Sequence, residues 1–178
     1  KGKINIPIIT TITDYTLHSA WLNRNVDYYI ISSECFKKEL RKWRVPEEKC
    51  KFYGIPVRKS FYYPLEREKA CRELNIKNTF TLLIMGGGLG LGNIDDTLEQ
   101  LNNHDINIQI IVVTGKNRKL YYELYRKYYK ELCTKNLKIY GYVSDVHKIM
   151  AVSDIIITKP GGLTITEAIL MELPIIIT

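Results

Sequence analysis

A regular alternation through the second two thirds of the chain constrains its fold more than any other feature. From about residue 66 onward, short apolar runs rich in Ile, Val and Leu alternate with stretches whose apolar residues recur at helical spacing. Strands of this kind separated by amphipathic helices predict a parallel sheet with helices on both faces. The expected strands are residues 79–85, 106–114, 137–140, 154–158 and 175 onward, and the expected helices are 66–74, 93–102, 116–133, 146–151 and 163–171.

The earlier part of the chain is less regular but of the same α/β class. β-branched residues predict one buried strand, and a second short strand, a helix and a brief strand are expected after it. The first strand is expected at residues 4–13, the second at 27–32, the helix at 33–43 and the brief strand at 51–53. Residues 60–64 follow no pattern and are the best linker. We therefore predict two parts, residues 1–58 and 59–178.

Composition narrows the class of protein. Of 178 residues, 46% are hydrophobic and 25% charged, which indicates a globular protein rather than a disordered one. The apolar runs are too short to span a membrane. Because the chain starts with Lys and stops in a strand, we expect sequence to be missing at both ends.

Cysteine, histidine and charge limit the chemistry. The four cysteines are widely spaced without a C-x-x-C pair, which favours reduced cytosolic thiols, and the three histidines are isolated, so a metal site has little support. The net charge of +7 favours anionic partners.

Residues 116–130 mix Lys and Arg with tyrosines. Such a stretch is compatible with RNA binding, with a membrane-surface helix or with an ordinary amphipathic helix. The ordinary helix is favoured, because Glu123 and Glu131 interrupt the basic face. Its inward residues would be Leu120, Leu124, Tyr128 and Leu132.

A glycine turn at residues 158–168 (TKPGGLTITEA) carries the most chemical information. A strand that runs through glycines into a helix presents free N–H groups and a positive dipole end, which bind phosphate. The same residues fit a capping box, with Thr164 as the cap and Glu167 bonding back to it. The spacing leaves capping and ligand binding open, and Glu167 could instead accept hydrogen bonds from ribose hydroxyls.

A second glycine run, residues 85–93 (MGGGLGLGN), joins a predicted strand to a helix. Its five glycines allow close approach of backbone to a ligand, so ligand contact is favoured over a plain connector. It fits neither a G-x-G-x-x-G fingerprint nor a Walker A loop. Two such turns in one α/β part indicate a nucleotide.

Two further positions are more ambiguous. Tyr142 and Val143 follow a predicted strand and could hold a nucleobase, although the residues alone favour core packing. His18 also follows a strand, and a lone histidine there is more often structural than catalytic.

Three stretches occur in the same order as in membrane-lipid sugar transferases: residues 54–58 (GIPVR), 85–90 (MGGGLG) and 158–168 (TKPGGLTITEA). Residues 13–21 (TDYTLHSAW) fit the same group. The chain thus resembles the monogalactosyldiacylglycerol synthase and processive diacylglycerol glucosyltransferase group of glycosyltransferase family 28. The lipid-II-forming N-acetylglucosaminyl transferase is a more distant relative.

The resemblance implies a GT-B fold of two Rossmann-like domains, both truncated here. Residues 1–58 would end the acceptor-binding domain, and residues 59–178 would form most of the donor-binding domain. The site it implies has several parts: Gly87, Gly88 and Arg58 at the donor diphosphate, Tyr142 and Val143 at the uracil, Gly162, Leu163, Thr164 and Thr166 at phosphate and ribose, and Glu167 on the ribose hydroxyls. The general base stays unknown, with His18 a weak candidate.

The resemblance also implies an activity. It is an inverting, metal-independent transfer of glucose or galactose from a UDP-sugar to diacylglycerol or a related lipid, with no cofactor and no nucleic acid partner. The enzyme would be cytoplasmic and peripheral on the anionic inner face of the cell membrane, and the fragment alone would be inactive. A lipid-II-type transferase and a non-catalytic nucleotide-sugar-binding module that needs a partner subunit remain as alternatives.

Overall fold

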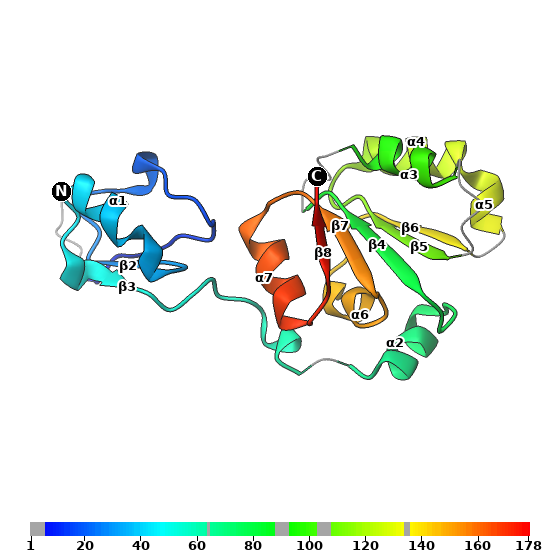
Figure 1. Ribbon diagram of the computed structural model, residues 1–178, viewed down its shortest axis with the longest axis horizontal. Coiled ribbons are helices and arrows are strands. Elements are labelled where there is room, and N and C mark those ends of the chain that lie inside the picture. Colours follow the sequence, from blue (N-terminus) through cyan, green and yellow to red (C-terminus); the bar gives the residue numbers. More distant parts are fainter. Residues whose placement is uncertain (1–5, 64, 88–92, 103–107, 134–135) are drawn as a thin grey trace. The chain divides into compact units, whose positions relative to one another are not determined.

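The computed structural model describes residues 6–63, 65–87, 93–102, 108–133 and 136–178. The chain divides into two compact units, Lys1–Val57 and Arg58–Thr178, each with a sheet of its own (Figure 1). This division lies one residue before the predicted one. The roles predicted for the two parts remain predictions.

The first unit is built on a small parallel sheet in the order β1-β2-β3. Ile9 pairs with Tyr28 and Tyr29 pairs with Cys50. A buried cluster that includes Ile31 and Leu40 forms its core. The bounds are β1 Ile9–Thr11, β2 Tyr28–Ile30, β3 Cys50–Lys51 and α1 Lys37–Lys42, with short 3-10 helices η1 Ser19–Trp21, η2 Glu34–Phe36 and η3 Glu47–Lys49. The described strands are shorter than predicted.

The second unit contains a five-stranded parallel sheet in the order β6-β5-β4-β7-β8. The strands are β4 Thr81–Met85, β5 Gln109–Val113, β6 Leu137–Tyr140, β7 Ile155–Thr158 and β8 Ile175–Ile177. The helices are η4 Lys59–Phe61, α2 Arg67–Leu74, α3 Ile94–Asn102, α4 Arg118–Lys127, α5 Tyr129–Cys133, α6 Val146–Ala151 and α7 Gly162–Leu170. The predicted parallel α/β sheet is confirmed.

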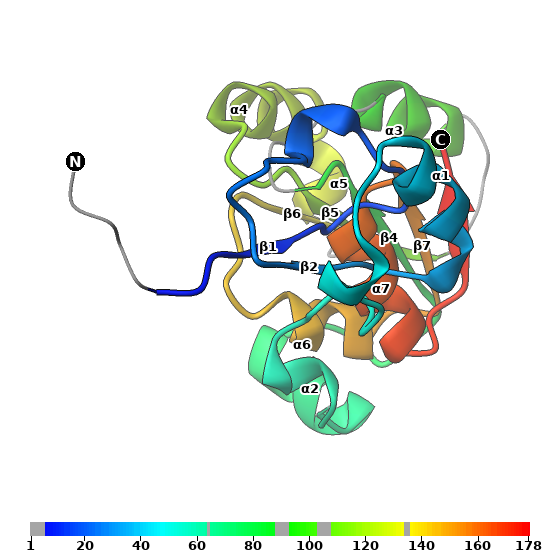
Figure 2. The same ribbon diagram turned by 90° about the vertical axis from the view of Figure 1, so that its left-hand side faces the viewer.

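Helices cover both faces of this sheet, which is why most residues of its strands are apolar. Leu82 and Val112 pack with α3 and α4 in one buried cluster. Leu83, Ile111 and Ile156 are fully buried and, by the alternation of a strand, point to the opposite face. Figures 1 and 2 show α2, α6 and α7 on that side.

The helix predicted over residues 116–133 is two helices. α4 ends at Lys127 and α5 begins at Tyr129, because Tyr128 has left the helical conformation (φ −108°, ψ 30°). Leu124 and Tyr128 are nevertheless buried. Leu120 and Leu132 pack against the same cluster, so the predicted inward face is confirmed.

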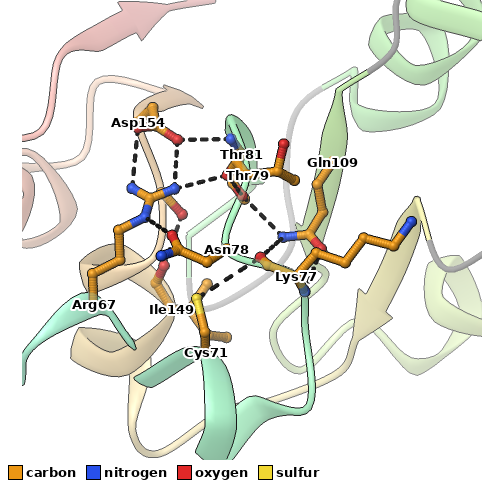
Figure 3. Close-up of polar contacts among 10 residues, drawn as sticks. Arg67, Cys71, Lys77, Asn78, Thr79, Thr81, Gln109, Ile149 and Asp154 are labelled. Atoms are coloured by element: carbon orange, nitrogen blue, oxygen red, sulfur yellow. Dashed lines mark hydrogen bonds and ion pairs between the residues drawn. The ribbon is translucent and has the colours of Figure 1, made fainter. Parts of the chain in front are cut away.

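A polar network ties the second unit together at the amino ends of β4 and β7 (Figure 3). Arg67 of α2 donates two hydrogen bonds to Asp154, at 3.0 and 2.9 Å. Asp154 also accepts from the Thr81 backbone N–H at 2.7 Å. Gln109 donates to the Thr81 hydroxyl at 2.9 Å. The network joins α2 to three strands at the edge opposite the glycine turns.

The order of the strands places a switch point between β4 and β7. From β4 the chain crosses to β5 and β6 on one side, and then returns to β7 and β8 on the other. Ligands of open parallel sheets bind at the carboxyl ends of strands where the direction of winding reverses. The carboxyl ends of β4 and β7 are therefore where a ligand is expected.

Candidate functional site

Two threonines join the strand ends at the carboxyl edge of the second sheet. Thr158, the last residue of β7, donates its hydroxyl to the carbonyl of Met85 at the end of β4 (2.9 Å). Thr114, just after β5, donates to the Tyr140 carbonyl at the end of β6 (3.2 Å). Both threonines are buried. These bonds hold the segments that follow the strands at fixed positions.

Gly87 and Lys159 lie next to each other at the switch point. Gly87 follows β4 with a φ of +69°, and a Cβ atom there would lie 2.9 Å from the Lys159 Cε. Among the described residues, the Lys159 ammonium makes no ion pair or hydrogen bond, so its charge is available to a ligand. Gly88 and the rest of the glycine run up to residue 92 lie outside the described residues.

The glycine turn leads directly into α7. Gly161 is the N-cap and makes no side-chain cap, and the first bond back to it comes from the Ile165 N–H at 3.0 Å. The N–H groups at the start of a helix have no partner within it, so those of Gly162, Leu163 and Thr164 can meet an anion. The Gly162 residue is buried, and Leu163 is 45% exposed.

The capping box, which the spacing left open beside ligand binding, is not formed. Thr164 stands inside α7, which already begins at Gly162. The Thr166 hydroxyl donates to the Gly162 carbonyl at 2.7 Å, inside the helix. Because Gly161 already serves as the N-cap, the helix begins at Gly162, three residues before Ile165, where the capping pattern would start it.

Glu167 lies one turn further along α7, close to Arg58. Burial raises the pKa of the Glu167 carboxyl, and the Arg58 charge opposes that rise. Arg58 is held by a hydrogen bond from its Nη1 to the Ser144 carbonyl (2.5 Å) and lies over the Phe61 ring, 5.9 Å from its centroid. The structure thus brings these two predicted site residues together.

Tyr142 lies beside an open pocket of about 770 Å³ at the carboxyl ends of β5 and β6. Its side chain is 65% exposed, so core packing, which the residues alone favoured, is wrong for Tyr142. The Lys116 ammonium lies 5.9 Å from the centre of the ring. Val143 is partly buried. An aromatic ring and a cation are thus open to a planar, anionic ligand.

His18 belongs to the first unit and has a structural role there. Its Nδ1 accepts a hydrogen bond from the Ala20 N–H at 3.1 Å and caps η1. Its ring contacts Trp21 edge-on at 6.1 Å. A catalytic role for His18 stays untested.

No group of three His, Cys, Asp or Glu side chains that could hold a metal ion occurs in the described parts of the chain. Nor is any described helix long and apolar enough to cross a membrane.

Lys159 is the residue that sequence reasoning missed. Lys159 lies within the glycine turn, but nothing in the spacing distinguishes it among the 26 lysines and arginines of the chain. A signal was present, since a cation directly after an apolar strand and before Pro-Gly-Gly must lie at the sheet edge. Its closeness to Gly87 depends on β4 and β7 being neighbours.

Two family descriptions match the chain. The glycosyltransferase family 28 C-terminal domain matches residues 81–178, more than half of the chain. The chain belongs to glycosyltransferase family 28. Residues 1–57 of this family 28 chain match the monogalactosyldiacylglycerol (MGDG) synthase family. The predicted resemblance is confirmed.

Curated relatives agree with the family 28 assignment. The processive diacylglycerol beta-glucosyltransferase of Bacillus cytotoxicus is 33% identical over 97% of this chain and 44% of its own length. The protein of the same name from Bacillus cereus strain B4264 is 34% identical over 98% of the chain and 45% of its own length. The family 28 chain spans just under half the length of these relatives.

Solved structures share its fold. Anabaena HepE in complex with UDP and glucose matches 95% of the family 28 chain and 52% of its own, with a TM-score of 0.61 at 17% identity. Acinetobacter baumannii MurG matches 98% of the family 28 chain and 46% of its own, with a TM-score of 0.58 at 19% identity. These likenesses concern the fold alone, and the predicted GT-B fold class is confirmed.

Proposed function

We propose that the protein to which this chain belongs transfers a hexose from a UDP-sugar to the hydroxyl of diacylglycerol. Membership of family 28 and the relatives named as diacylglycerol glucosyltransferases support this reaction. Those names favour glucose over galactose as the sugar. Because the relatives extend well beyond the chain, the activity is assigned to the whole protein.

The observation that carries the proposal is the convergence at the β4–β7 switch point. Three features meet there: an ammonium without a partner among the described residues, a glycine with positive φ, and a helix N-terminus without a side-chain cap. Each is suited to a diphosphate: Lys159 by charge, Gly87 by close approach of the backbone, and α7 by its free N–H groups. We assign the donor diphosphate to this place.

The other site residues follow from this placement. Glu167 accepts hydrogen bonds from the ribose hydroxyls, and the Arg58 charge opposes the rise in the pKa of that carboxyl. Arg58 also remains a proposed contact of the donor diphosphate, as the resemblance implies. Tyr142 and Val143 hold the uracil beside the open pocket. Gly88, Leu163, Thr164 and Thr166 remain proposed donor contacts, as the resemblance implies.

The reaction then has a simple charge balance. The acceptor hydroxyl attacks the anomeric carbon, the bond from that carbon to the diphosphate breaks, and UDP leaves with the bonding electron pair. Lys159 and the start of α7 stabilise the charge that develops on the leaving oxygen, which is the work that a metal ion performs in other transferases. The proton of the hydroxyl goes to a base that none of the residues assigned here supplies.

The full-length protein tests this function directly. It is supplied with diacylglycerol and either UDP-glucose or UDP-galactose, and the lipid products are resolved. We expect glucosyl lipid from UDP-glucose, without added metal, and much less product from UDP-galactose. Transfer to a different acceptor, or no transfer from either donor, would refute the proposal.

A further inference from the structure

The outer side of α4 and α5 carries a group of tyrosines and cations. Two of them, Arg118 and Tyr122, also line the pocket beside Tyr142, and the others have no part in the proposed function. Tyr122 and Tyr129 are each 59% exposed, and Tyr125 is 42% exposed. We call this surface the tyrosine–basic face. Its exposed members are Arg118, Lys119, Tyr122, Tyr125, Arg126, Tyr129 and Lys130.

The two helices are held so that this face points away from the core. Leu124 and Tyr128 are buried on the inner side. Lys127 donates hydrogen bonds to Asp95 (2.9 Å) and Glu99 (3.0 Å) of α3, and these bonds raise its pKa. Arg118, Tyr122, Tyr125 and Arg126 then share one side of α4, because residues four and seven apart lie on the same face.

The cations of the face are largely uncompensated. Among the residues that the structure describes, Arg118, Arg126 and Lys130 make no ion pair. Lys119 lies 3.8 Å from Glu123, an exposed acid of the same helix that offsets this one charge. The tyrosine–basic face therefore presents a net positive charge.

The tyrosine rings form a continuous row. Tyr121 lies 6.0 Å from Tyr125 and Tyr125 lies 6.4 Å from Tyr129, between ring centroids. Tyr122 packs edge-on against Tyr121 at 5.3 Å. The row crosses the break between α4 and α5, so both helices present one surface. Each ring combines an apolar body with a hydroxyl, which suits the boundary between water and hydrocarbon.

We propose that the tyrosine–basic face binds the surface of an anionic lipid bilayer. Exposed cations attract negatively charged headgroups, while tyrosine rings enter the headgroup region beside them. Single-stranded RNA is held in basic grooves with ring faces free to stack, whereas Tyr125, Arg126, Tyr129 and Lys130 lie outside the lining of the pocket beside Tyr142. Here several rings pack edge-on against one another, which leaves fewer faces for bases.

Vesicle binding by the full-length protein tests this surface. One variant is Arg126→Gln/Lys130→Gln. The matched control is Lys69→Gln/Arg72→Gln, which removes the same charge from exposed positions of α2, on the other face of the sheet. With vesicles of phosphatidylglycerol and phosphatidylcholine, we expect about a tenfold weaker partition for the α4–α5 variant and less than a twofold change for the control. Equal losses for both variants would overturn the proposal.

A fluorescent tryptophan distinguishes direct contact of the face with the bilayer from general electrostatic attraction of the protein to it. In Tyr129→Trp the new indole is expected to shift its emission to the blue with anionic vesicles and not with phosphatidylcholine alone. Tyr62→Trp, at another exposed tyrosine of the same unit, is expected to show no such shift. No shift at position 129, or tighter binding to a single-stranded RNA oligomer that is lost with the same two cations, would overturn the proposal.

The proposal concerns binding and does not depend on sugar transfer. Vesicle partition is measured without donor or acceptor, so its failure would leave the proposed transfer intact. A failed transfer assay would equally leave the partition result standing.

Discussion

At the residue scale, the position of the Lys159 side chain depends on its neighbour Gly87. The Lys159 side chain passes over Gly87, in the space that a Cβ atom at position 87 would enter. Gly87 also has a positive φ. An l-residue at position 87 would be strained by roughly 1–2 kcal/mol in that backbone conformation. It would also displace the end of the lysine side chain. The two residues are expected to act as a unit.

Lys159→Gln is expected to weaken UDP-glucose binding by the full-length protein about tenfold or more, because a charge-assisted contact to the diphosphate is lost. Gly87→Ala should weaken it in the same direction by moving the ammonium. Isothermal titration calorimetry measures both, with Lys69→Gln on α2 as the control that keeps wild-type affinity. In the double variant the two effects should not add. Simple additivity would contradict the coupling.

The protonation of Glu167 is expected to make donor binding depend on pH. Its pKa is raised by burial, so the carboxyl takes up a proton at a higher pH than an exposed glutamate does. Ribose hydroxyls donate to the ionised form. Binding should therefore be strong above the raised pKa and weaken as the pH falls through it.

UDP-glucose affinity, measured against pH, is expected to fall on the acid side in wild type and to stay flat there in Glu167→Gln. UDP-glucose suits the measurement because its diphosphate has no terminal group that titrates near neutrality. An unchanged acid limb in Glu167→Gln would show that another group is responsible.

At the scale of elements, the position of β7 depends on the Arg67–Asp154 network. Asp154 precedes the strand and receives hydrogen bonds from α2 and from the β4 backbone (Figure 3). Both side chains of the ion pair are 31% exposed, so the pair is sheltered from solvent more than the surface pairs of this chain. Its loss would leave the Arg67 guanidinium and the Thr81 N–H short of partners.

Asp154→Ala is expected to lower the free energy of unfolding by about 2 kcal/mol. Urea unfolding followed by circular dichroism measures the change. Glu68→Ala serves as the control, because its ion pair with Arg72 is long and exposed (3.9 Å) and should be worth less than about 0.5 kcal/mol. Similar losses in the two variants would contradict the assigned role of the network.

At the scale of the whole molecule, each of the two units has a core of its own. Leu40 and Tyr29 belong to the core of the first unit, and Leu124 and Val112 to that of the second. A cavity in one core should therefore lower the stability of that unit first.

Leu124→Ala is expected to cost the second unit about 2–5 kcal/mol, because Leu124 is almost fully buried. Hydrogen exchange of the full-length protein should then show faster exchange in β5 and β6, while the amides of β2 keep their protection. Leu40→Ala provides the reciprocal control in the first unit. Equal loss of protection in both units after either change would contradict separate cores.

The sequence by itself determined the α/β class, the positions of most strands and helices, and the family. It could do so because buried parallel strands must be apolar and amphipathic helices must repeat their apolar residues, so both are visible locally. The glycine turns were visible as well, and Gly87 has the positive φ that few residues other than glycine adopt.

Only the tertiary structure decided which residues far apart in the sequence lie side by side. The nearness of Lys159 to Gly87 depends on β7 crossing back to pair with β4, and the exposure of Tyr142 depends on which loops surround it. The start of α7 at Gly162 likewise overrode a plausible capping pattern. Contacts between residues far apart in the chain leave no periodic signal in it, and the site is made of such contacts.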